Sequence, residues 1–208
     1  MRTDNLDEPT MNQIMTQSAE LAAAREEALR KVGRNVVNFQ KVETCLRYLI
    51  TVSDVQTTKD GLSAEPRRRI AKTQRLPFGH LSETFYQTIY GAEAVAVEPN
   101  NGTHISISTS FRVEADAATV KRQKRTLSAL VTERNRLIHR DLSGFDHNSI
   151  SSCRDLIAML DEQNVRVLSQ LEELATLIAE FKAHMDALRK WAEADGPNTR
   201  VQCPSHDA

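Results

Sequence analysis

The sequence predicts a predominantly all-α fold, an antiparallel helical bundle with an inserted β-hairpin, on three observations. Two long proline-free segments repeat apolar side chains every three or four residues, as amphipathic helices do. Glycine supplies 7 of 208 residues and aromatic residues 5%, too little for the turns and aromatic pairs of a β-sandwich or barrel. One stretch alternates apolar and polar residues around an Asn-Gly pair, which predicts the hairpin.

The N-terminal half is expected to hold one long helix and one short helix. Residues 1–17 are mostly polar, include a proline and lack an apolar period, so we expect a disordered N-terminal segment. The long helix should run from an N-cap at Ser18 to residue 52. Its apolar face comprises Val32, Val36, Phe39, Val42, Leu46 and Leu49. Residues 53–75 are polar and predict a loop or a long connection.

The short helix is predicted over Phe78–Tyr90, opened by Pro77 and closed by Gly91 at the C′ position. The hairpin follows at about 93–113, around Asn101-Gly102. Because a lone hairpin is marginal in water, it should lean on the helices or on a second subunit.

The C-terminal half predicts two further helices. Asp116 should open a helix from residue 117 to about 142, and Ser149 or Ser151 should cap the longest helix, which ends near residue 194. Its expected apolar face comprises Leu156, Met159, Leu160, Leu168, Leu171, Leu174, Ile178, Phe181, Met185 and Leu188. We therefore expect one bundle over 18–194 and a flexible tail over 195–208, with a long coiled-coil dimer as the rival architecture.

Composition and cysteine usage exclude several classes. The longest apolar runs are only a few residues, so no transmembrane helix is expected, and the polar N-terminus does not resemble a signal peptide. The three cysteines, Cys45, Cys153 and Cys203, are far apart and have no metal-ligand spacing, which favours a reducing cytoplasm over disulfides or a zinc site. Glycine-rich phosphate loops and GxSxG, HExxH and CxxC motifs are absent from the sequence, so we expect no cofactor and no metal.

The formal net charge is −1, but the cations are clustered. Residues 66–75 carry five Lys/Arg and no acid, and residues 121–140 carry seven Lys/Arg against the single acid Glu133. Arginine outnumbers lysine 19 to 8, and its planar fork suits phosphate groups. These runs indicate a nucleic-acid surface, although each could equally be a solvated helix face.

The segment TERNRLIHRD, at 132–141, concentrates groups that could cleave RNA without a metal. His139 could take a proton from a 2′-hydroxyl or give one to the leaving 5′-oxygen. Arg134 could stabilise the charge on the pentacoordinate phosphate, and Asn135 could orient the phosphate or the imidazole. On an ideal helix Asn135 and His139 share a face, whereas Arg134 and His139 differ by about 140°.

This segment resembles the HEPN superfamily, whose members carry Arg-x(4–6)-His with a polar residue, often Asn, directly after the Arg. Arg134, Asn135 and His139 fit that form. The same spacing recurs at Arg75/His80, Arg140/His147 and Arg200/His206, but only Arg134/His139 sits late in a basic helix. GRNVVNFQKVE, at 33–43, resembles the opening helix of some members, and the resemblance spans about residues 18–190.

The resemblance implies a helical bundle that dimerises, with Arg and His of both subunits lining one cleft. It also implies metal-independent endoribonuclease activity, commonly in toxin–antitoxin or antiviral systems, so an antitoxin protein is a possible partner. Arg134, Asn135 and His139 would be catalytic, and Gln40 and Glu43 would either face the cleft or lie on the surface. The expected RNA-binding cations are Arg136, Arg140, Lys121, Arg122, Lys124 and Arg125. Since some members are inactive, the alternative is a non-enzymatic RNA- or protein-binding module.

Overall fold

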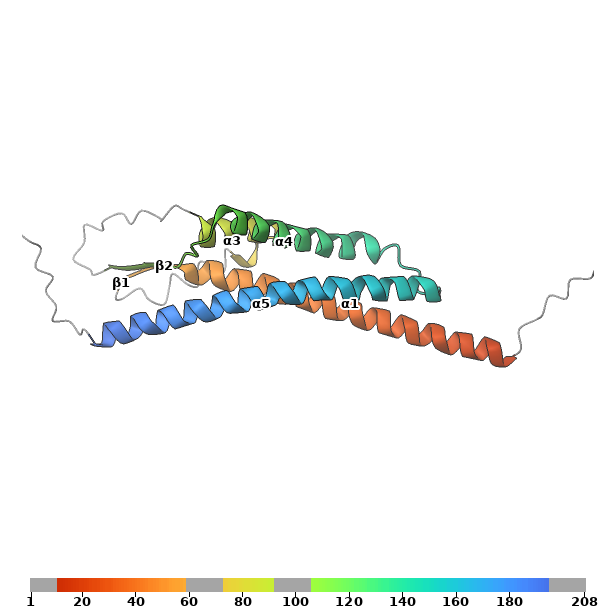
Figure 1. Ribbon diagram of the computed structural model, residues 1–208. Helices are drawn as coiled ribbons and strands as arrows, with labels where there is room; N and C mark the ends of the chain where they lie inside the picture. The colour runs from red at the N-terminus through yellow and green to blue at the C-terminus, as the bar shows by residue number, and fades with distance from the viewer. Residues whose placement is uncertain (1–10, 59–72, 92–105, 195–208) are drawn as a thin grey trace, which may run out of the picture.

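The computed structural model describes residues 11–58, 73–91 and 106–194 (Figure 1). The elements follow in the order α1 (Met11–Ser53), β1 (Asp54–Thr58), α3 (Phe78–Tyr90), β2 (Ser106–Ser110), α4 (Ala117–Arg136), a π-helical turn η1 (Leu137–Asp141) and α5 (Ile150–Ala194). This part of the chain is predominantly helical, as the sequence predicted. Within it, no helix combines the length and the apolar character needed to cross a membrane.

The two longest helices, α1 and α5, lie side by side and run in the same direction (Figure 1). Lys31 of α1 contacts Asp161 of α5, and further along both helices the rings of Tyr48 and Phe181 meet edge to face at 6.2 Å. The predicted antiparallel bundle is therefore wrong for this pair. The single helix α4 carries the chain back along the bundle, so α5 starts at the same end as α1.

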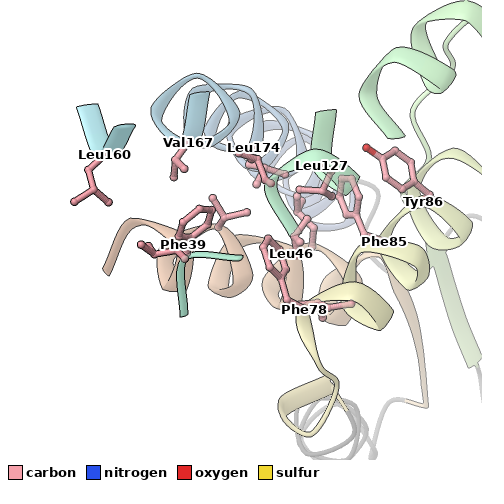
Figure 2. Packing of buried hydrophobic residues seen from close by; sticks show 14 of the residues in the cluster. Phe39, Leu46, Phe78, Phe85, Tyr86, Leu127, Leu160, Val167 and Leu174 are labelled. Atoms are coloured by element: carbon pink, nitrogen blue, oxygen red, sulfur yellow. The ribbon is translucent and has the colours of Figure 1, made fainter. Parts of the chain in front are cut away.

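The core lies where α3 and α4 cover the crossing of α1 and α5 (Figures 1 and 2). Its largest fully buried side chains come from α1, α3, α4, α5 and η1: Phe39, Val42, Leu46 and Leu49, Leu81 and Ile89, Leu127 and Leu130, Leu160, Val167 and Leu174, and Leu137. Leu168, predicted for the apolar face of α5, is instead 42% exposed, because Val167 takes the inward position.

A layer of polar side chains interrupts the apolar contact between α1 and α5. The Asn35 amide, fully buried, donates to the Leu160 carbonyl at 2.8 Å and to the Gln163 amide oxygen at 2.9 Å. Beside it, the hydrogen bond from Lys31 lowers the pKa of Asp161. Because these groups satisfy one another only in one alignment, the layer favours a single register of the two helices.

Helix α1 begins at Met11 rather than at Ser18. No proline or glycine lies between Pro9 and Gly33, so nothing in the sequence stops the helix at the expected N-cap. Residues 1–10, the remainder of the segment expected to be disordered, lie outside the described residues, as does the expected tail 195–208.

The caps of the later helices follow the sequence more closely. Asp116 accepts a hydrogen bond from the Thr119 N–H at 2.9 Å and opens α4 as predicted, and Ser149 accepts from the Ser152 N–H at 3.3 Å, which identifies it as the cap of α5. Helix α3 has the predicted bounds, but Gly91 has φ −70° and ψ 140°. The C-terminal end of α3 therefore lacks the left-handed glycine that often closes a helix.

The predicted β-hairpin around Asn101-Gly102 is not supported. Strand β2 pairs antiparallel with β1, with Asp54 opposite Ser110 and Thr58 opposite Ser106. Its predicted partner strand and turn fall within 92–105, outside the described residues. The observed partner of β2 is β1, which lies in the segment that was expected to be a loop. A loop was expected there because the polar sequence DVQTT carries no apolar alternation.

Candidate functional site

The end of α4 changes from an α-helix to a π-helical turn at the predicted motif. The Leu142 N–H donates to the Leu137 carbonyl at 3.1 Å, five residues earlier, where an α-helix would bond four residues apart. The sequence predicted an uninterrupted α-helix to about residue 142. Single π-helical turns are rare and often occur at functional sites. Here the turn keeps Leu137 fully buried while His139 stays exposed.

Arg134, the last charged residue of α4 to face α1, is held by two neighbours. Its Nη1 donates to the Asn135 amide oxygen at 3.1 Å, and its Nε lies 3.9 Å from the Glu43 carboxylate. The Arg134 side chain is 33% exposed, and that of Glu43 is 14% exposed. The guanidinium is therefore partly fixed and still open to solvent.

Glu43 also accepts a hydrogen bond from Arg47 Nη2 at 3.1 Å, so one carboxylate lies between two guanidinium groups. Arg47 in turn donates to the Thr73 and Leu76 carbonyls at 3.3 and 3.2 Å, ahead of α3. Arg47 was not among the predicted site residues. Its spacing of four from Glu43 on a helix was the signal that could have identified it.

A cavity of about 110 Å³ adjoins Arg134 between α1 and the end of α4. It is lined by Val36, Phe39, Gln40, Glu43, Arg134, Leu137 and Ile138. Gln40 and Glu43, which the sequence left as either surface or cleft residues, thus lie beside Arg134. The cavity combines an apolar wall with an amide, a carboxylate and a guanidinium.

His139 and Asn135 are exposed at the same end of α4. Ser143 donates to the His139 and Arg140 carbonyls at 3.2 and 2.9 Å. These bonds hold the backbone of the turn and do not involve the His139 imidazole ring. Among the described residues, no side chain hydrogen bonds to that ring, and it does not line the Arg134 cavity. One chain therefore brings Arg134, Asn135, Gln40 and Glu43 together, with His139 on the turn that follows.

The predicted RNA-binding cations are not gathered around Arg134. Arg136 is paired with Asp141 at 3.2 Å, and Lys124 with Glu83 at 3.2 Å. Arg140 is exposed on the π-helical turn. Lys121, Arg122 and Arg125 are exposed on earlier turns of α4. At 1.5 Å per residue, they lie about 14–20 Å from Arg134 along the helix axis. The second basic run, 66–75, lies mostly outside the described residues.

Potential metal ligands are not clustered in the described ranges, where no group of three or more His, Cys, Asp or Glu side chains is placed to hold an ion. Two of the three cysteines, Cys45 and Cys153, are described and carry free thiols. The side chains available near Arg134 for chemistry are therefore the guanidinium, amide, carboxylate and imidazole groups already named.

Comparison with known proteins identifies no relative: no family model, no curated protein and no solved structure matches this chain.

Proposed function

We propose that this chain is a metal-independent endoribonuclease of the HEPN type, with Arg134, Asn135 and His139 as its active set. The observation that carries the proposal is the π-helical turn, which presents the exposed imidazole of His139 four residues after Asn135, with no hydrogen-bond partner in the part of the chain that the structure describes. The setting would be a toxin–antitoxin or antiviral system in the cytoplasm, with RNA as the substrate and an antitoxin protein as a possible partner.

The reaction is an intramolecular transesterification of the RNA backbone. The 2′-oxygen attacks the adjacent phosphorus, the bond from phosphorus to the 5′-oxygen breaks, and a 2′,3′-cyclic phosphate and a 5′-hydroxyl form. An imidazole takes the proton from the 2′-hydroxyl, and an acid returns one to the 5′-oxygen. Arg134 stabilises the charge that develops on the phosphate, and Asn135 orients the guanidinium through the 3.1 Å hydrogen bond.

Because one chain supplies a single imidazole at the motif, we propose that a homodimer completes the site with a second His139. Leu29, Gly33 and Val37 form an exposed stripe of α1. A Cβ built on Gly33 would meet no atom within 4 Å outside its own stretch of helix. Such a stripe permits close approach of the same helix from a second copy. Leu137, the apolar residue beside the motif, is already buried within its own chain and is not available to such a contact.

The second candidate is a non-enzymatic module that binds RNA or a partner protein through the same surface. It is favoured by Glu43, whose carboxylate lies 3.9 Å from Arg134 and competes with a phosphate for the guanidinium. Under this candidate the imidazole has no chemical role, so its removal would leave RNA binding and any growth effect unchanged.

The test is the cleavage of RNA by the His139→Ala variant, with His147→Ala as the matched control. Both histidines are exposed and lie close together in sequence, so neither substitution should disturb folding. Loss of the acid–base group should lower the rate about 10²–10⁴-fold in the His139 variant and leave the His147 variant at the wild-type rate. Equal rates in the three proteins would refute the proposed site, and an inactive wild type that binds RNA would favour the module.

A further inference from the structure

A second cavity, remote from the motif, lies where α3, α4 and α5 meet. Its volume is about 210 Å³, and its apolar wall is formed by Phe85, Tyr90, Leu174 and Leu177. At about 30 Å³ for each water-sized group, it has room for a ligand of about seven non-hydrogen atoms. The proposed nuclease reaction assigns no role to it.

The polar part of the wall is formed by Gln123, Gln170, Glu173 and Thr176. Gln170, which is 4% exposed, donates through Nε2 to the Glu173 carboxylate at 3.2 Å. The Oε1 of the same amide is buried without a donor among the described residues. A buried acceptor without a donor is costly, so a ligand that donates a hydrogen bond to it, after a small turn of the amide, would stabilise the site.

The described lining of the cavity carries one negative charge. It includes Glu173 and no lysine or arginine. Burial raises the pKa of Tyr90, and the Glu173 and Glu180 carboxylates raise it further. Tyr86, whose ring stacks on that of Tyr90 at 5.7 Å, has its pKa raised by the same burial and by Glu173.

Aromatic rings complete a wall that suits a cation. The Phe85 and Tyr90 rings meet edge to face at 6.0 Å, and both border the cavity. The faces of such rings attract ammonium and guanidinium groups, and more strongly where water is excluded. An aromatic wall, one carboxylate and an acceptor without a donor together select a short alkyl chain that ends in a charged donor.

We propose that this cavity binds a small organic cation, a primary ammonium or guanidinium group on a short alkyl chain, with Glu173 and Gln170 receiving the charged end and Phe85 and Tyr90 enclosing it. The inference is independent of the nuclease proposal. Two sources carry this chemistry, a free polyamine and the side chain of a lysine or arginine.

The experiment is an NMR titration of the ¹⁵N-labelled full chain with butylammonium chloride at constant ionic strength, with 1-butanol as the neutral probe of the same size. We expect saturable shifts at the amides of 170–177 with a dissociation constant of about 1 mM, the range for so small a ligand. Butanol should produce no saturable shift there. No saturation by butylammonium, or equal binding of both probes, would overturn the proposal.

The matched variants are Glu173→Gln and Glu172→Gln, two exposed neighbours of which only Glu173 lines the cavity. The first should raise the dissociation constant at least about tenfold, and the second should leave it within about twofold, since only the first removes a charge at the bound cation. Equal effects of the two variants would contradict the assigned site. Spermidine and Nα-acetyl-lysine methylamide, titrated in the same way, then distinguish the two sources by which binds more tightly.

Discussion

At the scale of single residues, Arg134 and Arg136 lie two positions apart on α4 and have different surroundings. Arg134 lines a cavity with its guanidinium next to Asn135 and 3.9 Å from Glu43. Arg136 points elsewhere, to Asp141 at 3.2 Å and to the Met159 sulfur at 3.6 Å. Both guanidinium groups thus have partners within the protein, but only that of Arg134 lines a cavity.

We therefore expect Arg134→Lys to lower RNA cleavage about 10²-fold, although it keeps the charge. Lysine has no planar fork with which to contact two phosphate oxygens, and the loss of one donor to a developing charge typically costs about 10²–10³-fold. Arg136→Lys should stay within about threefold of wild type. Initial rates at saturating RNA measure both effects. A lysine at 134 that works as well as arginine would exclude the proposed contact.

At the scale of elements, the pairing of α1 with α5 depends on polar as well as apolar contacts. The fully buried Asn35 side chain donates hydrogen bonds to the Leu160 carbonyl and to the Gln163 amide oxygen. Arg34 adds hydrogen bonds to the Leu160 carbonyl and to Asp161, each at 3.1 Å. The motif end of α4 packs on this same pair, so the alignment of α1 and α5 also sets the position of Glu43 relative to Arg134.

We expect Asn35→Ala to lower the free energy of unfolding by about 1–3 kcal/mol, because it removes the donor to the buried Gln163 amide oxygen and one of the two side-chain donors to the Leu160 carbonyl. Thr44→Ala is the control on the same helix, since Thr44 is exposed and its hydroxyl donates to the Gln40 carbonyl of its own helix. Its effect should stay within about 0.5 kcal/mol. Urea denaturation followed by circular dichroism measures both. A change of less than about 0.5 kcal/mol at Asn35 would show that the layer is not required for the pairing.

The elements also show what the sequence can and cannot predict. The bounds of α3 and the cap of α4 were predictable because Pro77 and Asp116 act on their own neighbourhood. The π-helical turn was not predicted, since it occupies the last five residues of the helical segment, and too few residues follow it to show a shift of the apolar pattern. The partner of β2 was not predicted because β1 lies about fifty residues away and is polar, and pairing over that distance has no local signal.

At the scale of the whole molecule, the direction of α5 relative to α1 depends on the chain between these two helices. The apolar periodicity within each helix does not reveal that direction. The sequence identified Arg134, Asn135 and Glu43 as candidates for one site, and the structure places them together because α4 returns along α1. It places His139 on the following turn, where a single chain does not join it to the Arg134 cavity. Completion of the proposed site therefore depends on a second copy.

We expect Val37→Asp to dissociate the proposed dimer and to remove cleavage without unfolding the chain. Val37 is 48% exposed in the α1 stripe and directly follows Val36, which lines the Arg134 cavity. A carboxylate at Val37 would be desolvated in each copy of the dimer. Val165→Asp is the control, since Val165 is 68% exposed on α5 and outside that stripe. Light scattering should give a dimer mass for wild type and Val165→Asp and a monomer mass for Val37→Asp. An active monomeric wild type at assay concentration would refute the shared site.

The central claim is tested most directly by the ends of the RNA that the purified protein produces in excess EDTA. We predict products with a 2′,3′-cyclic phosphate and a 5′-hydroxyl, identified by mass spectrometry, from wild-type protein and none from His139→Ala. An oligonucleotide with a 2′-deoxy nucleotide at the cleavage position should remain intact, because the attacking oxygen is missing. Cleavage of that oligonucleotide, cleavage that requires an added divalent metal, or cyclic-phosphate products from His139→Ala would contradict the account.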